Sequence, residues 1–327
     1  MHGLLKMGLY ELYKVIGYVP KFEQFKDGNA NTAFVNHANK TYALNEQNFP
    51  FEIEIPKSDQ EFDIKSKGFK SFGEQLNHNV SAHPKVDRKK KELITYGYDI
   101  FGKDGTNLKY TLFDKDNNKI NELGIPLRGP VMIHDIAITE TNVVFNDLPM
   151  QFKPEQIAIG SPAFEFNKNM TAKYGIMNRR CTDVNEIKWF ELPNHFVFHF
   201  INAWDSVNER GEDIVTMFGC SLNDISLEHK HKENYDDPSE QEHPFLWEAQ
   251  DSECRQKLTK YTFNLTTGEC EMKYLLENLS SDFPIIDQDE MGYKNRYAYL
   301  TYFSDEIPDE KNGIYSQFFE GVYKYDL

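Results

Sequence analysis

The sequence predicts an all-β fold, and two observations carry that prediction. The chain of 327 residues contains 18 Tyr and 25 Phe, and aromatic side chains are enriched in strands. Short runs of aromatic and β-branched residues also recur from about residue 30 to the C-terminus, with turn-forming residues between them. Many short strands at close intervals are typical of a β-sandwich or of a β-propeller, whose blades have four strands each.

The first predicted element is a short amphipathic helix within residues 1–20. Four apolar residues recur there at the spacing i, i+4, i+7 and i+11, which places them on one helix face: Leu5, Leu9, Leu12 and Ile16.

The elements that follow are predicted strands of four to eight residues. They cover residues 32–35, 41–45, 92–99, 109–114, 142–146, 188–192, 197–204, 213–218, 258–265, 270–276, 296–303 and 321–327. Alternation is clearest at Tyr261, Phe263 and Leu265, which polar residues separate.

Turns and loops complete the expected organisation. The triplets at 116–118 and 266–268 contain Asn or Gly, which tolerate tight-turn dihedrals, and each predicts a hairpin. Residues 226–256 are crowded with charged side chains and poor in aliphatic ones, so we expect an acidic loop or insertion. No Gly/Ser linker separates two parts, and 1–327 is predicted to be a single domain.

Charge and cysteine spacing exclude several classes of function. The net charge of −16 would repel phosphate backbones, so we expect no nucleic-acid partner. The N-terminus lacks the pattern of a secretory signal, and the four cysteines are far apart without a Cys-x-x-Cys pair. We therefore expect a cytoplasmic protein with reduced thiols.

Three histidines occupy distinctive settings. They are His83 in Ala-His-Pro-Lys-Val-Asp, His134 in Ile-His-Asp-Ile-Ala, and His199 in Phe-His-Phe-Ile-Asn. Intervals of 51 and 65 residues separate them, about one propeller blade or somewhat more, since a blade takes roughly 40–50 residues. On a regular strand His199 shares a face with Val197 and Ile201, where a buried imidazole needs a partner. Each histidine taken alone is more often structural, whereas the three together suit iron, copper, nickel or zinc.

Three further histidines have weaker claims to function. His195 precedes His199 by four residues, but Pro193 and Asn194 predict a turn just before it. His37 and His78 have no convincing partner in the sequence.

The sequence resembles the carotenoid cleavage dioxygenases over nearly its whole length. The resemblance lies in a collinear series of motifs: 31–33, 42–46, 82–87, 96–98, 134–140, 147–150, 189–193, 198–204, 282–284, 296–299 and 321–327. It implies a seven-bladed β-propeller of the carotenoid oxygenase type, with Fe(2+) held by four histidines. His83, His134 and His199 match three of these ligands. Glu46 and Asp282 match acidic positions that accept hydrogen bonds from the distal imidazole nitrogens.

The resemblance also implies a reaction and its partners. The expected function is dioxygenase cleavage of a C=C bond in a carotenoid or apocarotenoid with O2, giving aldehydes or ketones. Asp282, where many members have Glu, is more like the plant-type enzymes that cut the 9,10(9',10') bond. The apolar stripe of residues 4–16 has two interpretations: packing on the propeller, or peripheral contact with a membrane that holds the substrate.

The chain also departs from the family pattern. A fourth histidine and a further carboxylate, found near the C-terminus of family members, have no match, so the propeller is expected to be incomplete. The alternatives to a dioxygenase are therefore an inactive fragment or apocarotenoid-binding remnant, or a retinoid ester isomerohydrolase-like member.

Overall fold

The computed structural model describes residues 29–46, 48–56, 63–99, 106–157, 163–225, 255–276, 279–303 and 319–327. The helix predicted within residues 1–20 lies outside these ranges, and so does nearly all of the insertion predicted at 226–256. No helix in the described ranges is long and apolar enough to cross a membrane.

The chain divides into two compact units. The first contains Met1–Asp99, Leu108–Ile125 and Arg180–Val184, and the second contains Ile100–Asn107, Pro126–Arg179 and Asn185–Leu327. The single domain predicted over 1–327 stays a prediction.

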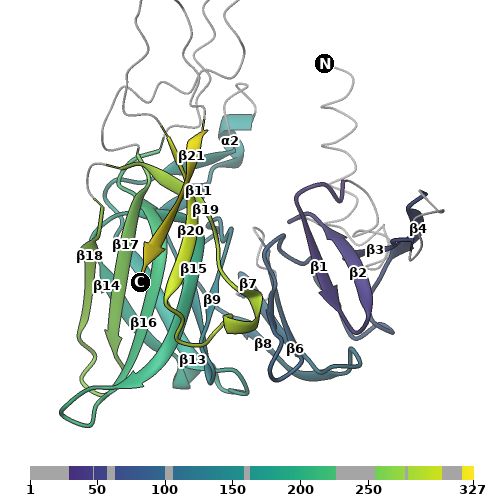
Figure 1. Ribbon diagram of the computed structural model, residues 1–327, viewed down its shortest axis with the longest axis horizontal. Helices are drawn as coiled ribbons and strands as arrows, with labels where there is room; N and C mark the ends of the chain where they lie inside the picture. Colours follow the sequence, from purple (N-terminus) through teal and green to yellow (C-terminus); the bar gives the residue numbers. More distant parts are fainter. Residues whose placement is uncertain are drawn as a thin grey trace, which may run out of the picture. The chain divides into compact units, whose positions relative to one another are not determined.

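The first unit contains two four-stranded antiparallel sheets (Figure 1). One has the order β1 (Ala33–His37), β2 (Lys40–Leu44), β3 (Phe51–Glu54), β4 (Lys65–Phe69). The other has the order β5 (Lys85–Asp87), β6 (Glu92–Tyr98), β7 (Leu108–Phe113), β8 (Lys119–Ile125). A hydrophobic cluster packs within this unit: Phe49, Leu76, Val80, Leu93 and Phe113.

The second unit contains two more four-stranded sheets. One has the order β14 (Lys188–Leu192), β13 (Ala172–Asn178), β10 (Asn142–Asp147), β9 (Ala137–Ile138). The other has the order β15 (Phe196–Val207), β16 (Asp213–Leu222), β17 (Lys257–Asn264), β18 (Cys270–Tyr274), and Figure 1 shows its long strands side by side.

Smaller elements complete the second unit. A three-stranded sheet has the order β19 (Ser281–Ile285), β20 (Tyr297–Phe303), β21 (Phe319–Asp326), and β11 (Met150–Phe152) pairs with β12 (Phe164–Phe166). Its described helices are short: α2 (Pro154–Ile157) and the 3-10 turn η5 (Gln288–Glu290). A further 3-10 turn, η2 (Val184–Glu186), begins at the last residue of the first unit.

In the sheet of β9, β10, β13 and β14, β10 pairs with β13, because β11 and β12 lie between them in the sequence and pair with each other. The other sheets pair antiparallel strands that follow one another in the chain, as in a propeller blade. Every strand predicted from the sequence overlaps an observed one.

Both predicted hairpins are confirmed. Asn117 adopts a φ of 64° between β7 and β8, and the Asp114 carboxylate accepts the N–H groups of Asp116 and Asn118 at 2.9 and 2.8 Å. Gly268 adopts a φ of 82° between β17 and β18, where the Asn264 side chain accepts the N–H of Thr266 at 2.9 Å. Side chains that satisfy backbone groups in this way favour turns over continued strand.

Two cores stabilise the second unit. The first is formed by side chains of β10, β13 and β15–β17, and it includes Val144, Tyr174, Phe200 and Phe263. The second is formed by side chains of β15–β17 and β20, and it includes Ile201, Trp204, Cys220 and Leu300. Alternation in β17 follows the prediction, because Tyr261 and Phe263 are buried and Thr262 between them is partly exposed.

Candidate metal centre

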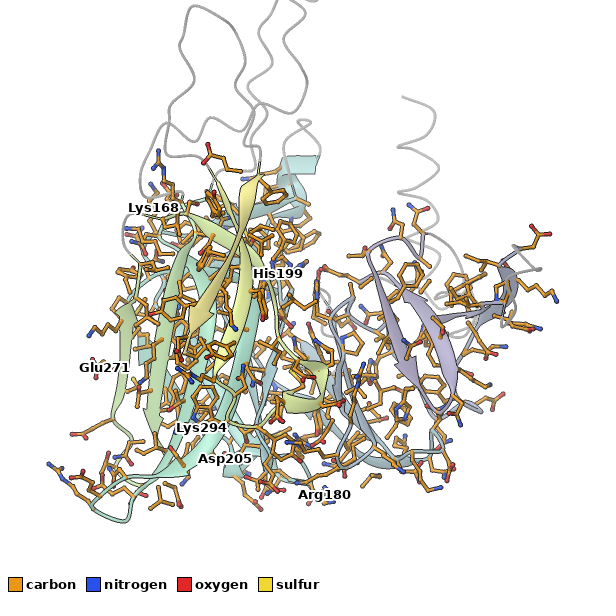
Figure 2. All side chains as sticks on the ribbon, in the orientation of Figure 1. Lys168, Arg180, His199, Asp205, Glu271 and Lys294 are labelled. Atoms are coloured by element: carbon orange, nitrogen blue, oxygen red, sulfur yellow. The ribbon has the colours of Figure 1, made fainter. Side chains whose placement is uncertain are left out.

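His199 lies on β15 at a β-bulge, and Figure 2 labels it. The register with β16 shifts between Val197 and Phe200 and again between Phe200 and Asn202. A bulge adds a residue to one strand and breaks the alternation of faces. Val197 packs in the first core and Ile201 in the second, so the prediction that His199 shares one face with both of them is wrong.

A buried carboxylate fixes the orientation of the His199 ring. Nδ1 of His199 lies 2.9 Å from Oδ1 of Asp282, and Asp282 is only 3 % exposed. An ionised carboxylate only accepts hydrogen bonds, so Nδ1 carries the proton and donates it to Asp282. Nε2 of His199 is then left with a lone pair.

The Asp282 carboxylate lies at a second irregularity, in β19. The pairing of β19 with β20 shifts between Asp282 and Ile285, and Phe283 adopts a φ of 49°. Positive φ is costly for a bulky side chain, and it occurs mostly where the surrounding structure or function requires it. The Phe283 ring lies 5.0 Å from the His199 ring, between centroids.

His134 lies just before β9 and faces His199. The two Nε2 atoms are 3.4 Å apart, and the rings meet edge to face with centroids 5.1 Å apart. Phe198 packs edge to face on His134 at 5.4 Å. Two imidazole nitrogens at this separation can share a proton or bind one metal ion.

The geometry of this pair fits a metal ion. Two nitrogens on one metal, each at a bond length of about 2.1 Å, cannot lie more than about 4.2 Å apart. The observed 3.4 Å meets that condition. The lone pair on Nε2 of His199 and the carboxylate behind Nδ1 are also the features that metal-binding imidazoles require.

The other predicted metal ligand, His83, belongs to the first unit. Among the described residues, the candidate metal ligands are His83, His134 and His199, and each is half-buried. His83 lies just before β5, and its backbone N–H donates to the Ser81 hydroxyl at 3.3 Å.

Glu46 also lies in the first unit, between β2 and β3. Its carboxylate accepts the hydroxyl of Tyr98 at 2.9 Å. Burial, and then the Glu46 charge, raise the pKa of Tyr98 well above its ordinary value, so the phenol stays protonated and donates. The Asn79 side chain holds the Glu46 backbone carbonyl at 2.8 Å.

The structure shows one further polar residue at the histidine pair that the sequence did not indicate. Asp135 is 2 % exposed, and its carboxylate accepts the backbone N–H of Phe200 at 2.8 Å. No local pattern signals such a contact, because the two residues are 65 positions apart.

In the described ranges, the other buried histidines have hydrogen-bond partners of their own. Nδ1 of His195 donates to the Pro193 carbonyl, and Nε2 accepts the Tyr174 hydroxyl, both at 2.7 Å. His78 contacts the Asn79 carbonyl and the Thr111 hydroxyl in the same manner, and His37 contacts the Asp114 carbonyl. Burial lowers the pKa of His78 and of His195 to about 4, so both stay neutral at pH 7.

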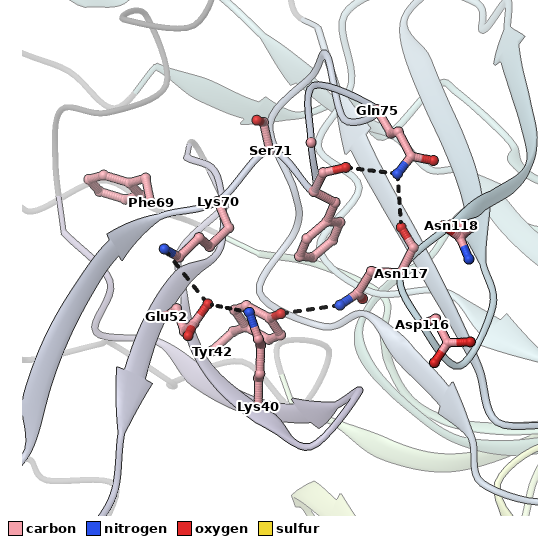
Figure 3. Close-up of a pocket in the computed structure, with 12 residues that line it drawn as sticks. Lys40, Tyr42, Glu52, Phe69, Lys70, Ser71, Gln75, Asp116, Asn117 and Asn118 are labelled. Carbon is pink, nitrogen blue, oxygen red and sulfur yellow. Dashed lines mark hydrogen bonds and ion pairs between the residues drawn. The ribbon is translucent and has the colours of Figure 1, made fainter.

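The first unit contains a cleft of about 360 Å³, which Figure 3 shows. Lys40 and Lys70 converge there on Glu52 at 3.1 and 3.8 Å, and the Tyr42 hydroxyl accepts from the Asn117 amide. Charged, polar and aromatic side chains therefore line this cleft together.

Known proteins match this sequence over most of its length. The sequence profile of the family described as retinal pigment epithelial membrane protein matches residues 4–327. Carotenoid 9,10(9',10')-cleavage dioxygenase 1 of Pisum sativum is 33 % identical over 278 residues, which are 84 % of this chain and 46 % of that protein. The enzyme of the same name from Arabidopsis thaliana is 33 % identical over 303 residues, or 91 % of this chain and 51 % of that protein. The chain thus spans about half the length of these relatives.

Solved structures show the same fold. The lignostilbene dioxygenase of Pseudomonas brassicacearum superposes with a TM-score of 0.71 at 23 % identity, over 91 % of this chain and 58 % of that one. Cobalt-substituted Synechocystis ACO superposes with a TM-score of 0.68 at 17 % identity, over 94 % and 60 %. At these identities the likeness establishes the fold alone, a β-propeller. The family match over residues 4–327 goes further: this chain belongs to the retinal pigment epithelial membrane protein family, which is the family of the carotenoid cleavage dioxygenases.

Proposed function

We propose that the chain belongs to a non-haem Fe(2+) dioxygenase that cleaves one C=C bond of a carotenoid or apocarotenoid with O2. The observation that carries the proposal is the histidine pair: two Nε2 atoms 3.4 Å apart, one of them freed as a ligand by the bond from Nδ1 to Asp282. Family membership supports both the metal and the reaction. The whole fold is then a seven-bladed propeller of the carotenoid oxygenase type.

The residues have separate tasks in this proposal. His134, His199 and His83 supply imidazole ligands, which suit iron among the first-row metals. Asp282 keeps the proton on Nδ1 of His199, and Glu46 is the acidic partner on the side of His83. Bound iron would supply the one-electron chemistry that O2 needs to react with a closed-shell alkene.

The overall reaction balances without another reactant. Both atoms of O2 enter the products, the C=C bond is lost, and two carbonyl groups form. The protein must orient the polyene and keep water from the reacting bond. The apolar rings of Phe198 and Phe283 beside the two histidines suit such a ligand.

The position of the cleaved bond in the polyene can also be inferred. We infer the 9,10(9',10') position, supported by relatives of that name at 33 % identity over 84 % and 91 % of this chain. Asp282, which occupies the acidic position beside His199, is consistent with that subgroup.

The test is product analysis after anaerobic reconstitution with Fe(2+). A β-apocarotenal is supplied with 18O2, and we expect two carbonyl products per polyene, each carrying one labelled oxygen. His199→Ala should abolish cleavage, whereas His195→Gln, which alters a buried histidine in the same strand region, should retain it. Retinyl ester hydrolysis without O2 uptake would show an isomerohydrolase instead, and iron binding without turnover of either substrate would overturn the catalytic assignment.

A further inference from the structure

Asp135 directly follows His134, and its carboxylate is buried. The residue is 2 % exposed. Oδ1 accepts the N–H of Ile136 at 2.8 Å, and Oδ2 accepts the N–H of Phe200 at 2.8 Å. A buried carboxylate is stable only with such partners. Because Phe200 directly follows His199, one carboxylate joins the two histidine-bearing segments.

The bulge in β15 explains why Phe200 needs this acceptor. The pairing of β15 with β16 shifts on both sides of Phe200. A bulge disrupts the ladder locally and leaves backbone groups without their regular strand partner. A buried N–H without an acceptor is costly, and the Asp135 carboxylate removes that cost with a charge-assisted bond.

The backbone carbonyl of Asp135 has a hydrogen-bond partner of its own on β10. Asn146 on β10 is 1 % exposed, and its side-chain amide donates to the Asp135 carbonyl at 2.7 Å. The segment that carries His134 is therefore tied to its own sheet through Asn146, and to the sheet of His199 through Asp135.

We propose that Asp135 is a positioning residue for the metal centre, fixing the separation of the His134 and His199 Nε2 atoms without contacting the metal. The inference rests on the proposed function, because the separation matters only if a metal binds there. Side chains that orient metal ligands typically change metal affinity by about 10–100-fold when they are replaced.

The test compares two isosteric substitutions at buried carboxylates. In Asp135→Asn the amide keeps an oxygen for one N–H but turns its NH2 group toward the other. The matched control is Asp147→Asn, because Asp147 is 1 % exposed, lies in the same unit and accepts the N–H of Arg128 at 3.0 Å. The probe is Co(2+), whose visible absorption reports both affinity and ligand geometry.

We expect Asp135→Asn to weaken Co(2+) binding about tenfold or more and to alter the absorption spectrum. Asp147→Asn should leave both unchanged within about threefold, although each variant lowers the free energy of unfolding in urea. Equal effects of the two variants, or no effect of Asp135→Asn, would overturn the proposal.

Hydrogen exchange of the Phe200 amide separates this proposal from the proposed function. It is measured on metal-free protein, so it reads the tether whether or not a metal binds. If wild-type protein binds no Co(2+), the proposed function fails. Faster exchange in Asp135→Asn than in Asp147→Asn would then still establish the tether, and equal exchange would refute it.

Discussion

At the residue scale, the proton on His199 determines what the histidine pair can bind. Asp282 keeps that proton on Nδ1, 2.9 Å away, so Nε2 faces His134 with a lone pair. With the other tautomer, Nε2 would carry hydrogen and could not coordinate a metal.

Replacing Asp282 with Asn should weaken metal binding. The amide removes the negative charge and can direct its NH2 group at Nδ1, which favours the wrong tautomer. We expect metal affinity to fall about 10–100-fold, measured by equilibrium dialysis against Fe(2+) under anaerobic conditions. Asp205→Asn is the control, because Asp205 lies on β15, the strand of His199, and accepts from Thr141 and Asn142 instead of a histidine. Unchanged affinity in Asp282→Asn would refute the tautomer argument.

The buried histidines predict a loss of stability in acid. Burial lowers the pKa of His195 to about 4, below the ordinary 6.5, so the unfolded chain binds more protons between those two pH values. Stability is therefore complete above about pH 6.5 and falls as the pH drops toward 4, by about 3 kcal/mol for such a residue.

The check is urea unfolding of wild type and His195→Gln at several pH values. The variant should show a shallower decline between pH 6.5 and 4, because the side chain no longer titrates. Identical slopes in the two proteins would mean that His195 is not buried as a neutral ring.

Sequence reasoning identified His134, His199 and Asp282 through motif resemblance, and the structure places all three together in the second unit. It did not indicate Asp135, because a carboxylate that accepts a distant backbone N–H leaves no local pattern. It also found no convincing partner for His37 and His78, although His37 contacts the Asp114 carbonyl and His78 has two hydrogen-bond partners.

At the element scale, strand prediction succeeded in β17, where buried and partly exposed residues alternate from Tyr261 to Phe263. It missed β9, which has two residues, and β5, which has three, because such short runs show no period. It also missed β13, which contains Gly175, and β19, which contains Pro284, because both residues weaken the strand signal.

Gly175 has a packing function that explains its presence in a strand. It pairs with Phe145 on one side and with Trp189 on the other, and those two rings meet with centroids 5.6 Å apart. A Cβ at this position would lie 2.3 Å from the Phe145 ring.

We therefore expect Gly175→Ala to destabilise the protein by about 1–3 kcal/mol, measured by urea unfolding. Gly129→Ala is the control, since a Cβ there has no neighbour within 4 Å, and its effect should stay within about 0.5 kcal/mol. Equal stability of the two variants would contradict the packing argument.

At the scale of the whole molecule, composition predicted the β class but could not choose between sandwich and propeller. Both folds use short antiparallel strands, and the choice depends on how sheets are arranged, which residue patterns do not encode. Collinear motifs resolved it, and the match over residues 4–327 confirms the family. The net charge of −16 also fits a neutral, apolar ligand better than a polyanion.

If His134 and His199 hold a catalytic iron, the iron content of the reconstituted chain must depend on both of them. The chain is reconstituted anaerobically with Fe(2+), desalted, and analysed for iron per polypeptide, beside His134→Ala, His199→Ala and the control His195→Gln. We expect close to one iron per chain in wild type and in the control, and a loss of at least about tenfold in the other two variants. Iron absent from wild type, or retained equally by all four proteins, would contradict it.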